Sequence, residues 1–341
     1  MKMTIKDIAR EANVSVTTVS FVLNGKAEKI SEETIRKVKA IAHRNNYVPN
    51  VQAVGLVTRK TKTIGLIIPD IENMFFSALA KHIETAFLRQ GYNIFLMNTN
   101  DVFARDLESI ELLKNRNVDG IVISLSKEAT QGKNMDKIYA ALKMTETPFV
   151  IVYRDIPRDD CSKVLNDDVF GGYLATKHLI ERGHTNIACI TGPMTVSSAA
   201  QRLQGYQQAL EEAGIPWNAD LVLEGDYQFE SGYQHASTLL KKDITAIFAC
   251  NDLMAYGVYR ACLEIDYRVP QDISLVGFDD LMFSSILEVP LTSVKQNVVD
   301  LSEKIAETML GQINGEPIDM QLMVRPSLTK RSSVSDAKRS V

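Results

Sequence analysis

The chain has 341 residues, is 45% hydrophobic and 23% charged, and has a formal net charge of −4 at pH 7. This composition indicates a soluble globular protein of two to three domains, and no apolar run approaches the roughly 20 residues that a membrane span needs. Because the N-terminus also lacks the apolar segment of a secretory signal, we expect a cytoplasmic protein with no membrane partner.

Charge is distributed unevenly along the chain. Residues 1–62 have 12 Lys and Arg against 5 Asp and Glu, a net charge of +7, whereas residues 63–341 have a net charge of −11. A basic end on an acidic body is typical of a protein whose one end meets nucleic acid, because attraction to phosphates supplies most of the affinity that is independent of base sequence.

Two short helical patterns lie near the N-terminus, in the segment DIAREANVSVTTVSFVLN, residues 7–24. Apolar residues recur at helical spacing on either side of Asn13-Val14-Ser15. Ser15 is a residue type favoured at an N-cap, so the second helix should begin at Val16. The pattern predicts a helix-turn-helix, although an ordinary pair of packed helices would have the same spacings. The basic charge of this end favours DNA binding.

A third helix should begin after Ser31, where an apolar stripe starts, and end near Asn45. Pro49 then breaks the helical pattern, and Asn50 can cap a short helix in the segment that follows. We therefore expect residues 1–48 to form a headpiece and residues 49–62 a hinge helix and linker. A plain flexible linker is the alternative.

From Thr63 onward the sequence alternates between apolar runs and amphipathic helical stretches, which predicts an α/β fold with buried parallel strands. The runs are TIGLIIPD, YNIFLMNTN, DGIVISLS, PFVIVYR, NIACITGP, AIFACNDL and DISLVGFDD. This region is long for one sheet, and the polar stretch from Arg154 to Asp168 suggests a crossover between two lobes. Residues 63–330 would form this body, and residues 331–341 a disordered tail.

Several of these strands end in polar residues, which suggests a binding cleft because the carboxyl ends of parallel strands line the ligand crevice of open α/β sheets. Asp and Asn are also common turn residues, so any single position has a structural explanation. The strand-end residues are Asp70, Asn98 to Asp101, Arg154, Asn251-Asp252 and Asp279-Asp280. The four cysteines have no CxxC spacing, so we expect buried thiols, with no metal and no cofactor.

Together these segments resemble the lactose-repressor and purine-repressor family of bacterial transcription regulators. TIKDIAREANVSVTTVSFVLN and NYVPN are similar to its DNA-binding headpiece. IERGHTNIACITGP, RLQGYQQALEEAG, AIFACNDLMAYGV and VPQDISLVGFDD are similar to its effector domain, which resembles periplasmic sugar-binding proteins. The resemblance covers about residues 3–330 and implies an all-α helix-turn-helix headpiece followed by a two-lobed, periplasmic-binding-protein-like α/β domain.

The resemblance implies that Val16, Thr17 and Phe21 face base edges in the major groove. Phe21 cannot make the bidentate contact to guanine that arginine makes, so apolar or shape-dependent readout is expected there, with core packing as its structural alternative. Leu56 would enter the minor groove from the hinge helix, which Gly55 weakens by about 1 kcal/mol relative to alanine. The residues expected to contact DNA are Thr4, Ser15, Val16, Thr17, Thr18, Ser20, Phe21, Asn24, Lys29, Tyr47, Asn50 and Leu56.

The resemblance also implies an effector site in the body. Aromatic faces there would stack on a sugar ring or a base, and planar polar side chains would bind hydroxyl groups. Asn251 and Gln296 favour a carbohydrate, whereas a purine corepressor would want acids and further aromatics. Asp167 is a looser match, because Asn166-Asp167 stands in reversed order. The expected residues are Asn73, Phe75, Phe76, Arg154, Asp167, Arg202, Tyr227, Asn251, Asp279 and Gln296.

The resemblance implies a homodimeric repressor of carbohydrate-utilisation genes that a sugar or sugar derivative releases from operator DNA. A regulator activated by a corepressor or a protein partner is the alternative. A periplasmic sugar-binding protein would require export and would not need the basic headpiece. An enzyme would need an activated nucleophile, a metal set or a phosphate loop, and the sequence has no such motif, so we expect no catalytic activity.

Overall fold

The computed structural model describes residues 3–23, 27, 29–47 and 60–337 of the chain. These residues fall into two compact units, Met1–Lys62 and Thr63–Val341. Asn24 and the expected hinge residues Asn50 and Leu56 lie outside the described residues. Within the described part of the chain, no helix is long and apolar enough to span a membrane.

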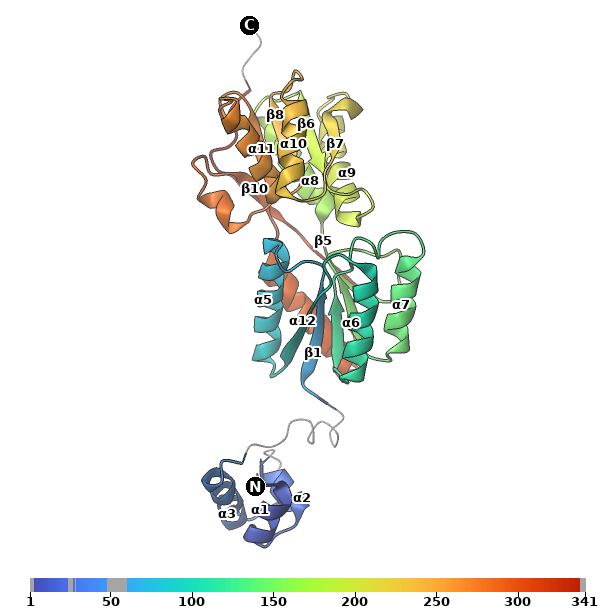
Figure 1. The fold of residues 1–341 in the computed structure, drawn as a ribbon, viewed down its shortest axis with the longest axis vertical. Coiled ribbons are helices and arrows are strands. Elements are labelled where there is room, and N and C mark those ends of the chain that lie inside the picture. Colours follow the sequence, from blue (N-terminus) through green and yellow to red (C-terminus); the bar gives the residue numbers. More distant parts are fainter. Residues whose placement is uncertain (1–2, 24–26, 28, 48–59, 338–341) are drawn as a thin grey trace. The chain divides into compact units, whose positions relative to one another are not determined.

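The first unit is a three-helix headpiece, as the sequence predicts. Asn13 has a φ of 57° and turns the chain after the first helix. Ser15 accepts a hydrogen bond from the backbone N–H of Thr18, and Ser31 caps the third helix in the same way. The helices are α1 (Ile5–Ala12), α2 (Val16–Leu23) and α3 (Glu32–Arg44) (Figure 1). A shared apolar core joins them, and its fully buried members include Ile8, Val19 and Val38.

The second unit contains two α/β lobes, and the described residues of the first lobe include a six-stranded parallel sheet (Figure 1). Its strands lie in the order β11-β5-β4-β3-β1-β2. Helices α5 and α12 pack on one face, and α6 and α7 pack on the other. The strands are β1 (Thr63–Ile68), β2 (Asn93–Asn98), β3 (Gly120–Ile123), β4 (Phe149–Val152), β5 (Ser162–Asn166) and β11 (Gln321–Val324). The helices are α5 (Met74–Arg89), α6 (Phe103–Asn115), α7 (Asn134–Met144) and α12 (Val298–Asn314).

The second lobe is built on a sheet of the order β12-β10-β9-β8-β6-β7, in which β12 alone runs antiparallel to its neighbour. Helix α8 packs on α9, and α10 packs on α11. The strands are β6 (Ile187–Thr191), β7 (Val222–Glu224), β8 (Ala246–Ala249), β9 (Ser274–Asp279), β10 (Thr292–Lys295) and β12 (Ser327–Thr329). The helices are α8 (Asp168–Glu181), α9 (Ser197–Glu212), α10 (Phe229–Leu239) and α11 (Asp252–Glu264), with short 3-10 turns at Ala219–Leu221 (η1) and Met282–Ser285 (η2).

The chain passes between the lobes three times, after β5, after β10 and after β11. The stretch from Arg154 to Asp168, which we expected to be a crossover, contains strand β5, so only its last residues cross. The sequence pattern does not predict β5, because Lys163 interrupts the apolar run of this strand. Lys163 is buried, its Nζ lies 2.9 Å from a carboxylate oxygen of Asp155, and it donates to the carbonyl of Ile156.

Residues 331–337, which we expected to belong to a disordered tail, lie against the second lobe. Ser333 is buried and donates a hydrogen bond to the carbonyl of Leu275, and a ring nitrogen of His184 lies 3.0 Å from the carbonyl oxygen of Ser335. Backbone and hydroxyl hydrogen bonds hold most of this segment, and Val334 is its one side chain in the apolar cluster of the second lobe, which explains why its polar sequence suggested disorder. Residues 338–341 lie outside the described residues.

Candidate functional site

The exposed face of α2 is the first candidate site. Val19 and Val22 point into the headpiece core, whereas Val16 and Phe21 are 42% and 45% exposed. Thr17 is exposed as well. The structure therefore places Phe21 on the surface and not in the core, which was its structural alternative. Since α2 carries no charged residue, this face offers methyl groups, hydroxyls and one aromatic ring.

Polar residues around α2 fix the ends of the headpiece helices. The hydroxyls of Ser15 and Thr18 lie 2.8 Å apart at the start of α2. Thr4 caps α1 and donates to a carboxylate oxygen of Asp7 at 2.6 Å. Tyr47 is half-buried against the headpiece core. The remaining expected residues with a described position are Ser20, which is half-buried, and Lys29, which is exposed.

The second candidate site is a narrow cleft between the two lobes. Eight of the ten expected effector residues line it, and they come from both lobes. These eight are Asn73, Phe75, Phe76, Arg154, Arg202, Tyr227, Asn251 and Asp279. The strands of both sheets end at this cleft, as the polar residues at the strand ends suggested.

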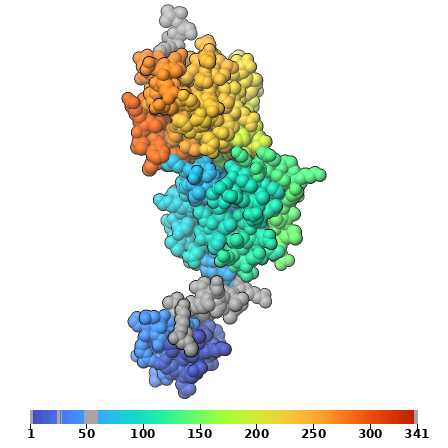
Figure 2. Space-filling model, viewed as in Figure 1, coloured from blue at the N-terminus to red at the C-terminus, as the bar shows by residue number. Residues whose placement is uncertain are grey.

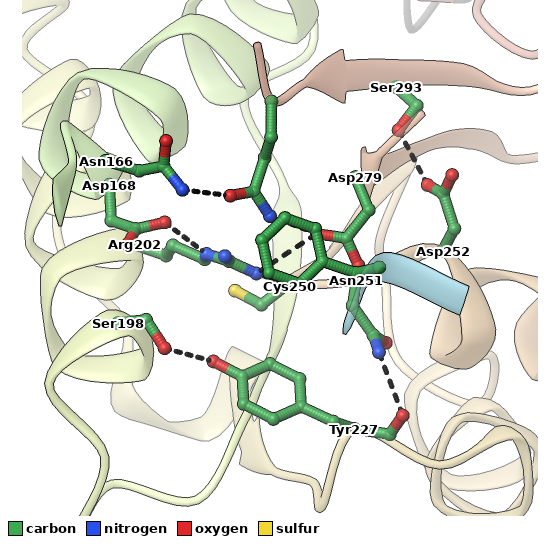
Figure 3. A network of polar contacts seen from close by, with 12 residues as sticks. Asn166, Asp168, Ser198, Arg202, Tyr227, Cys250, Asn251, Asp252, Asp279 and Ser293 are labelled. Carbon is green, nitrogen blue, oxygen red and sulfur yellow. Dashed lines mark hydrogen bonds and ion pairs between the residues drawn. The ribbon is translucent and has the colours of Figure 1, made fainter. Parts of the chain in front are cut away.

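Arg202, on α9, is the centre of the cleft (Figure 3). Its side chain is fully buried, and its Nε donates to Asp168 at 2.8 Å while its Nη1 donates to the carbonyl of Cys250 at 2.5 Å. The guanidinium also lies 3.6 Å from the ring centroid of Phe278 and 3.9 Å from a carboxylate oxygen of Asp279. Its charge is therefore compensated within the protein, and the cleft offers no free guanidinium at this point.

Two glycines let the backbone come close enough for this arrangement. A Cβ on Gly172 of α8 would overlap the carbonyl of Arg202, so the glycine allows α8 to pack directly on α9. A Cβ on Gly192, just after β6, would overlap the ring of Tyr227. The absence of a side chain at Gly172 and Gly192 thus allows Arg202 and Tyr227 to lie where they do.

The first lobe contributes an aromatic group and a second buried arginine. The ring of Phe76 lies 5.3 Å from that of Phe75, in an edge arrangement. Arg154 is buried, pairs with Asp101 and donates to the carbonyl of Leu125. Its Nε has no hydrogen-bond partner among the described residues. Because an unsatisfied buried donor is costly, this N–H is a natural point for a ligand oxygen to bind.

Two of the expected residues lie outside the cleft lining. Gln296 is buried behind the cleft, where it donates to Asp279 at 2.5 Å and accepts from Asn166. Asp167 caps α8 by accepting from the backbone N–H of Phe170. Asn251 does line the cleft, and it also caps α11 and donates to the carbonyl of Tyr227 at 2.8 Å.

Eight residues line the cleft besides the expected effector residues. Asp70 and Asp101 follow strands β1 and β2, so the strand-end pattern did contain their signal. Lys127, Asp226 and Gln228 lie in loops that no motif marked. The added residues are Asp70, Asp101, Lys127, Tyr153, Pro193, Val196, Asp226 and Gln228.

The backbone and the pKa values of the cleft are perturbed. Tyr153, Tyr227 and Asp279 have φ values of 65°, 70° and 108°, a region that costs free energy for residues other than glycine. Burial raises the pKa of Asp279 to about 7, although the nearby Arg202 guanidinium acts in the opposite direction. Strained backbone and shifted carboxylates of this kind concentrate at functional sites.

A helix-turn-helix with an exposed recognition face, together with a two-lobed domain that has a polar and aromatic cleft, defines a ligand-responsive DNA-binding regulator. Comparison with known families agrees with this class. Residues 4–50 match bacterial regulatory proteins of the lacI family, and residues 61–330 match the periplasmic binding proteins and sugar binding domain of the LacI family. The chain therefore belongs to the LacI family of transcriptional regulators, and it is not an enzyme.

Curated relatives cover almost the whole chain. The ribose operon repressor of Escherichia coli is 34% identical over 97% of this chain and 99% of its own length. The HTH-type transcriptional repressor PurR of Vibrio atlanticus is 33% identical over 97% of this chain and 98% of its own length. The structure of the lac repressor dimer bound to operator and the anti-inducer ONPF matches with a TM-score of 0.86 and 28% identity, covering 98% of this chain and all of that one.

Proposed function

We propose that the protein is a repressor of carbohydrate-utilisation genes that a sugar or sugar derivative releases from its operator. The observation that carries this proposal is the composition of the cleft, to which Phe75 and Tyr227 contribute aromatic rings and Arg154 contributes a buried N–H without a hydrogen-bond partner among the described residues. Sugars are bound by aromatic faces and by planar side chains with several donors and acceptors. Identity alone does not decide between sugar and purine, because both kinds of relative match equally well.

The proposed acting form is a homodimer in the cytoplasm, in which each headpiece reads one half of a near-palindromic operator. The lac repressor is a dimer in its operator complex. In this chain two segments of the second lobe expose large apolar side chains, which is typical of surfaces that contact a partner. We call them the second-lobe apolar surface, and its members are Leu263, Ile265, Tyr267, Met282, Phe283 and Ile286.

Release requires only that the effector binds the DNA-incompetent state more tightly than the DNA-bound state. The short hinge helix expected within residues 49–62 is below the ~12–15 residues that are marginally stable alone, so it depends on support from DNA and the partner subunit. A change in how the lobes close would alter that support. Coupling free energies of ~1–3 kcal/mol between two such sites are typical.

The test is operator binding by the full-length protein with and without each member of a panel of sugars and purines. A ligand is first identified by a rise in melting temperature, since binding to the folded state stabilises it. The proposal predicts that the ligand is a sugar and that it weakens operator binding. A purine that tightens operator binding would instead establish the corepressor alternative, and strong binding that requires an added protein would establish the partner alternative.

A further inference from the structure

Tyr153 is a cleft residue that no motif of the sequence marked. It directly follows β4, at the point where the first sheet ends, and its φ of 65° lies in the left-handed region. Its side chain is among those that line the cleft, yet only 8% of the residue is exposed. A bulky residue adopts this backbone only where its surroundings hold it there, so the position calls for a functional explanation.

The phenol of Tyr153 contacts both lobes. Its ring lies 4.5 Å from the ring of Phe75, on the first lobe, with an angle of 37° between the planes. Its hydroxyl accepts a hydrogen bond from Nη2 of Arg202, on the second lobe, at 3.1 Å. One side chain therefore spans the cleft from its aromatic wall to its central guanidinium.

Two further contacts join the two lobes near Tyr153. The backbone N–H of Asp155 donates to the hydroxyl of Ser197 at 3.0 Å, which joins the segment after β4 to the start of α9. Leu281, from the second lobe, belongs to the same apolar cluster as Phe75 and Tyr153. In Figure 2 the yellow and orange surface of the second lobe accordingly lies directly against the blue and green surface of the first lobe.

The hydrogen bonds of Arg202 explain why an acceptor is needed beside its Nη2. Asp168 and the carbonyl of Cys250 satisfy its Nε and Nη1, and the hydroxyl of Tyr153 satisfies Nη2. Without that hydroxyl a buried guanidinium N–H would lose its hydrogen-bond partner, which is unfavourable. Burial raises the pKa of Tyr153, so the hydroxyl stays neutral. It thus resembles the hydroxyl group of a bound ligand.

We propose that Tyr153 is an internal occupant of the effector cleft, which holds the two lobes together without ligand and which an effector ring has to displace. The inference rests on the proposed function only in treating this cleft as the effector site. It specifies the ligand further: a ring with a flat face for Phe75 and, at its edge, a hydroxyl or carbonyl oxygen that accepts from Arg202. An acyclic ligand would satisfy Arg202 but would leave Phe75 uncovered.

The test compares Tyr153→Phe with Tyr139→Phe in the full-length, ligand-free protein. Tyr139 is a matched control, since it is equally buried and its hydroxyl is hydrogen-bonded, at 2.5 Å, to Asp160 within the same lobe. We expect Tyr153→Phe to raise amide hydrogen exchange at least fivefold in the first turn of α9 and in residues 226–228, across the cleft from the substitution. Tyr139→Phe should leave exchange there unchanged. Equal exchange in wild type and Tyr153→Phe would overturn the proposal.

A rescue experiment tests the occupancy directly. Tyr153→Ala leaves a space with the shape of the lost side chain, and p-cresol is that side chain as a free molecule. We expect p-cresol to restore wild-type exchange in the first turn of α9, and toluene, which lacks the hydroxyl, to leave it fast. Rescue by both compounds, or by neither, would overturn the role of the Arg202 hydrogen bond. If Tyr153→Ala does not fold, Tyr153→Phe alone decides. Neither measurement uses DNA or a sugar. The proposed function can therefore fail its operator-binding test without changing the result of these two experiments.

Discussion

At the scale of single residues, Arg202 shows that a side chain can belong to the binding cleft and to the core at once. It is fully buried, and three hydrogen bonds join it to Asp168, Cys250 and Tyr153. Removing one partner of a buried ion pair leaves an uncompensated charge, which typically costs about 3–5 kcal/mol. A lost effector response in an Arg202 variant is therefore evidence of a ligand contact only if the variant is as stable as the wild type.

We predict that Arg202→Ala lowers the free energy of unfolding of the second unit by about 3–5 kcal/mol, because it leaves the buried Asp168 carboxylate without its ion-pair partner. Chemical unfolding of the full-length protein, followed by circular dichroism, measures this loss. The double variant Arg202→Met with Asp168→Leu should lose less, since it removes both charges and keeps the volume. If Arg202→Ala were as stable as the wild type, the ion pair with Asp168 would not stabilise the fold. Ligand binding would then be the main role of Arg202.

Asp279 gives a prediction on pH. Burial raises its pKa to about 7 from an ordinary value of 3.8, so the folded protein binds this proton more tightly than the unfolded chain. The contribution of Asp279 to the free energy of unfolding therefore falls as pH rises from about 4 to about 7, and it is constant above pH 7. We expect the melting temperature of Asp279→Asn to fall less than that of the wild type between pH 5 and pH 8. Parallel curves for the two proteins would contradict the shifted pKa.

At the scale of elements, α2 is the second helix of the helix-turn-helix and has no charged or amide side chain. Specific contacts to guanine or adenine usually need Arg, Lys, Asn or Gln, whereas methyl groups and aromatic rings contact the methyl of thymine. The exposed Val16 and Phe21 therefore favour operator half-sites whose central pairs are A·T.

We predict that replacing thymine by uracil at the base pair facing Phe21 weakens operator binding about fourfold, because burial of one methyl-sized group is worth about 0.8 kcal/mol. Titration of labelled duplexes with the full-length protein measures the effect. The Phe21→Ala variant should bind both duplexes equally. If its sensitivity to uracil matched that of the wild type, Phe21 would not be the contact.

At the scale of the whole molecule, the second-lobe apolar surface is the part of the proposed dimer that can be tested without DNA. Ile286 is 67% exposed and follows η2, where Met282 and Phe283 are exposed as well. We predict that Ile286→Glu shifts the dimer toward monomer by at least tenfold in dissociation constant, as measured by analytical ultracentrifugation. Met144→Glu is the control, because Met144 is 72% exposed at the end of α7 in the first lobe. Equal dissociation of both variants would place the interface elsewhere.

Much of this fold could be predicted from sequence, because the strongest signals are local. Helical spacing and capping residues gave the three headpiece helices, and Ser15 and Ser31 cap them as expected. Seven apolar runs correspond to strands β1, β2, β3, β4, β6, β8 and β9. The other strands were missed because β7 and β12 are only three residues long, β10 contains Thr and Ser, β11 is an exposed edge, and β5 contains a buried lysine.

The cleft could be predicted in part. Resemblance to a family located eight of its residues and the polar strand ends located two more, Asp70 and Asp101, because both signals depend on sequence position alone. Tyr153 lies within the run PFVIVYR and has the pattern of one more strand residue. Its positive φ and its hydrogen bond to Arg202 arise from contacts across the two lobes, which no local pattern records.

The three passages of the chain between the lobes have a consequence for synthesis on the ribosome. The headpiece is a contiguous segment that precedes both lobes, so it leaves the ribosome before them and can fold while they are still being translated. The first lobe needs α12 and β11, which follow nearly all of the second lobe in the chain. A nascent chain thus completes its helix-turn-helix well before either lobe of the body is complete.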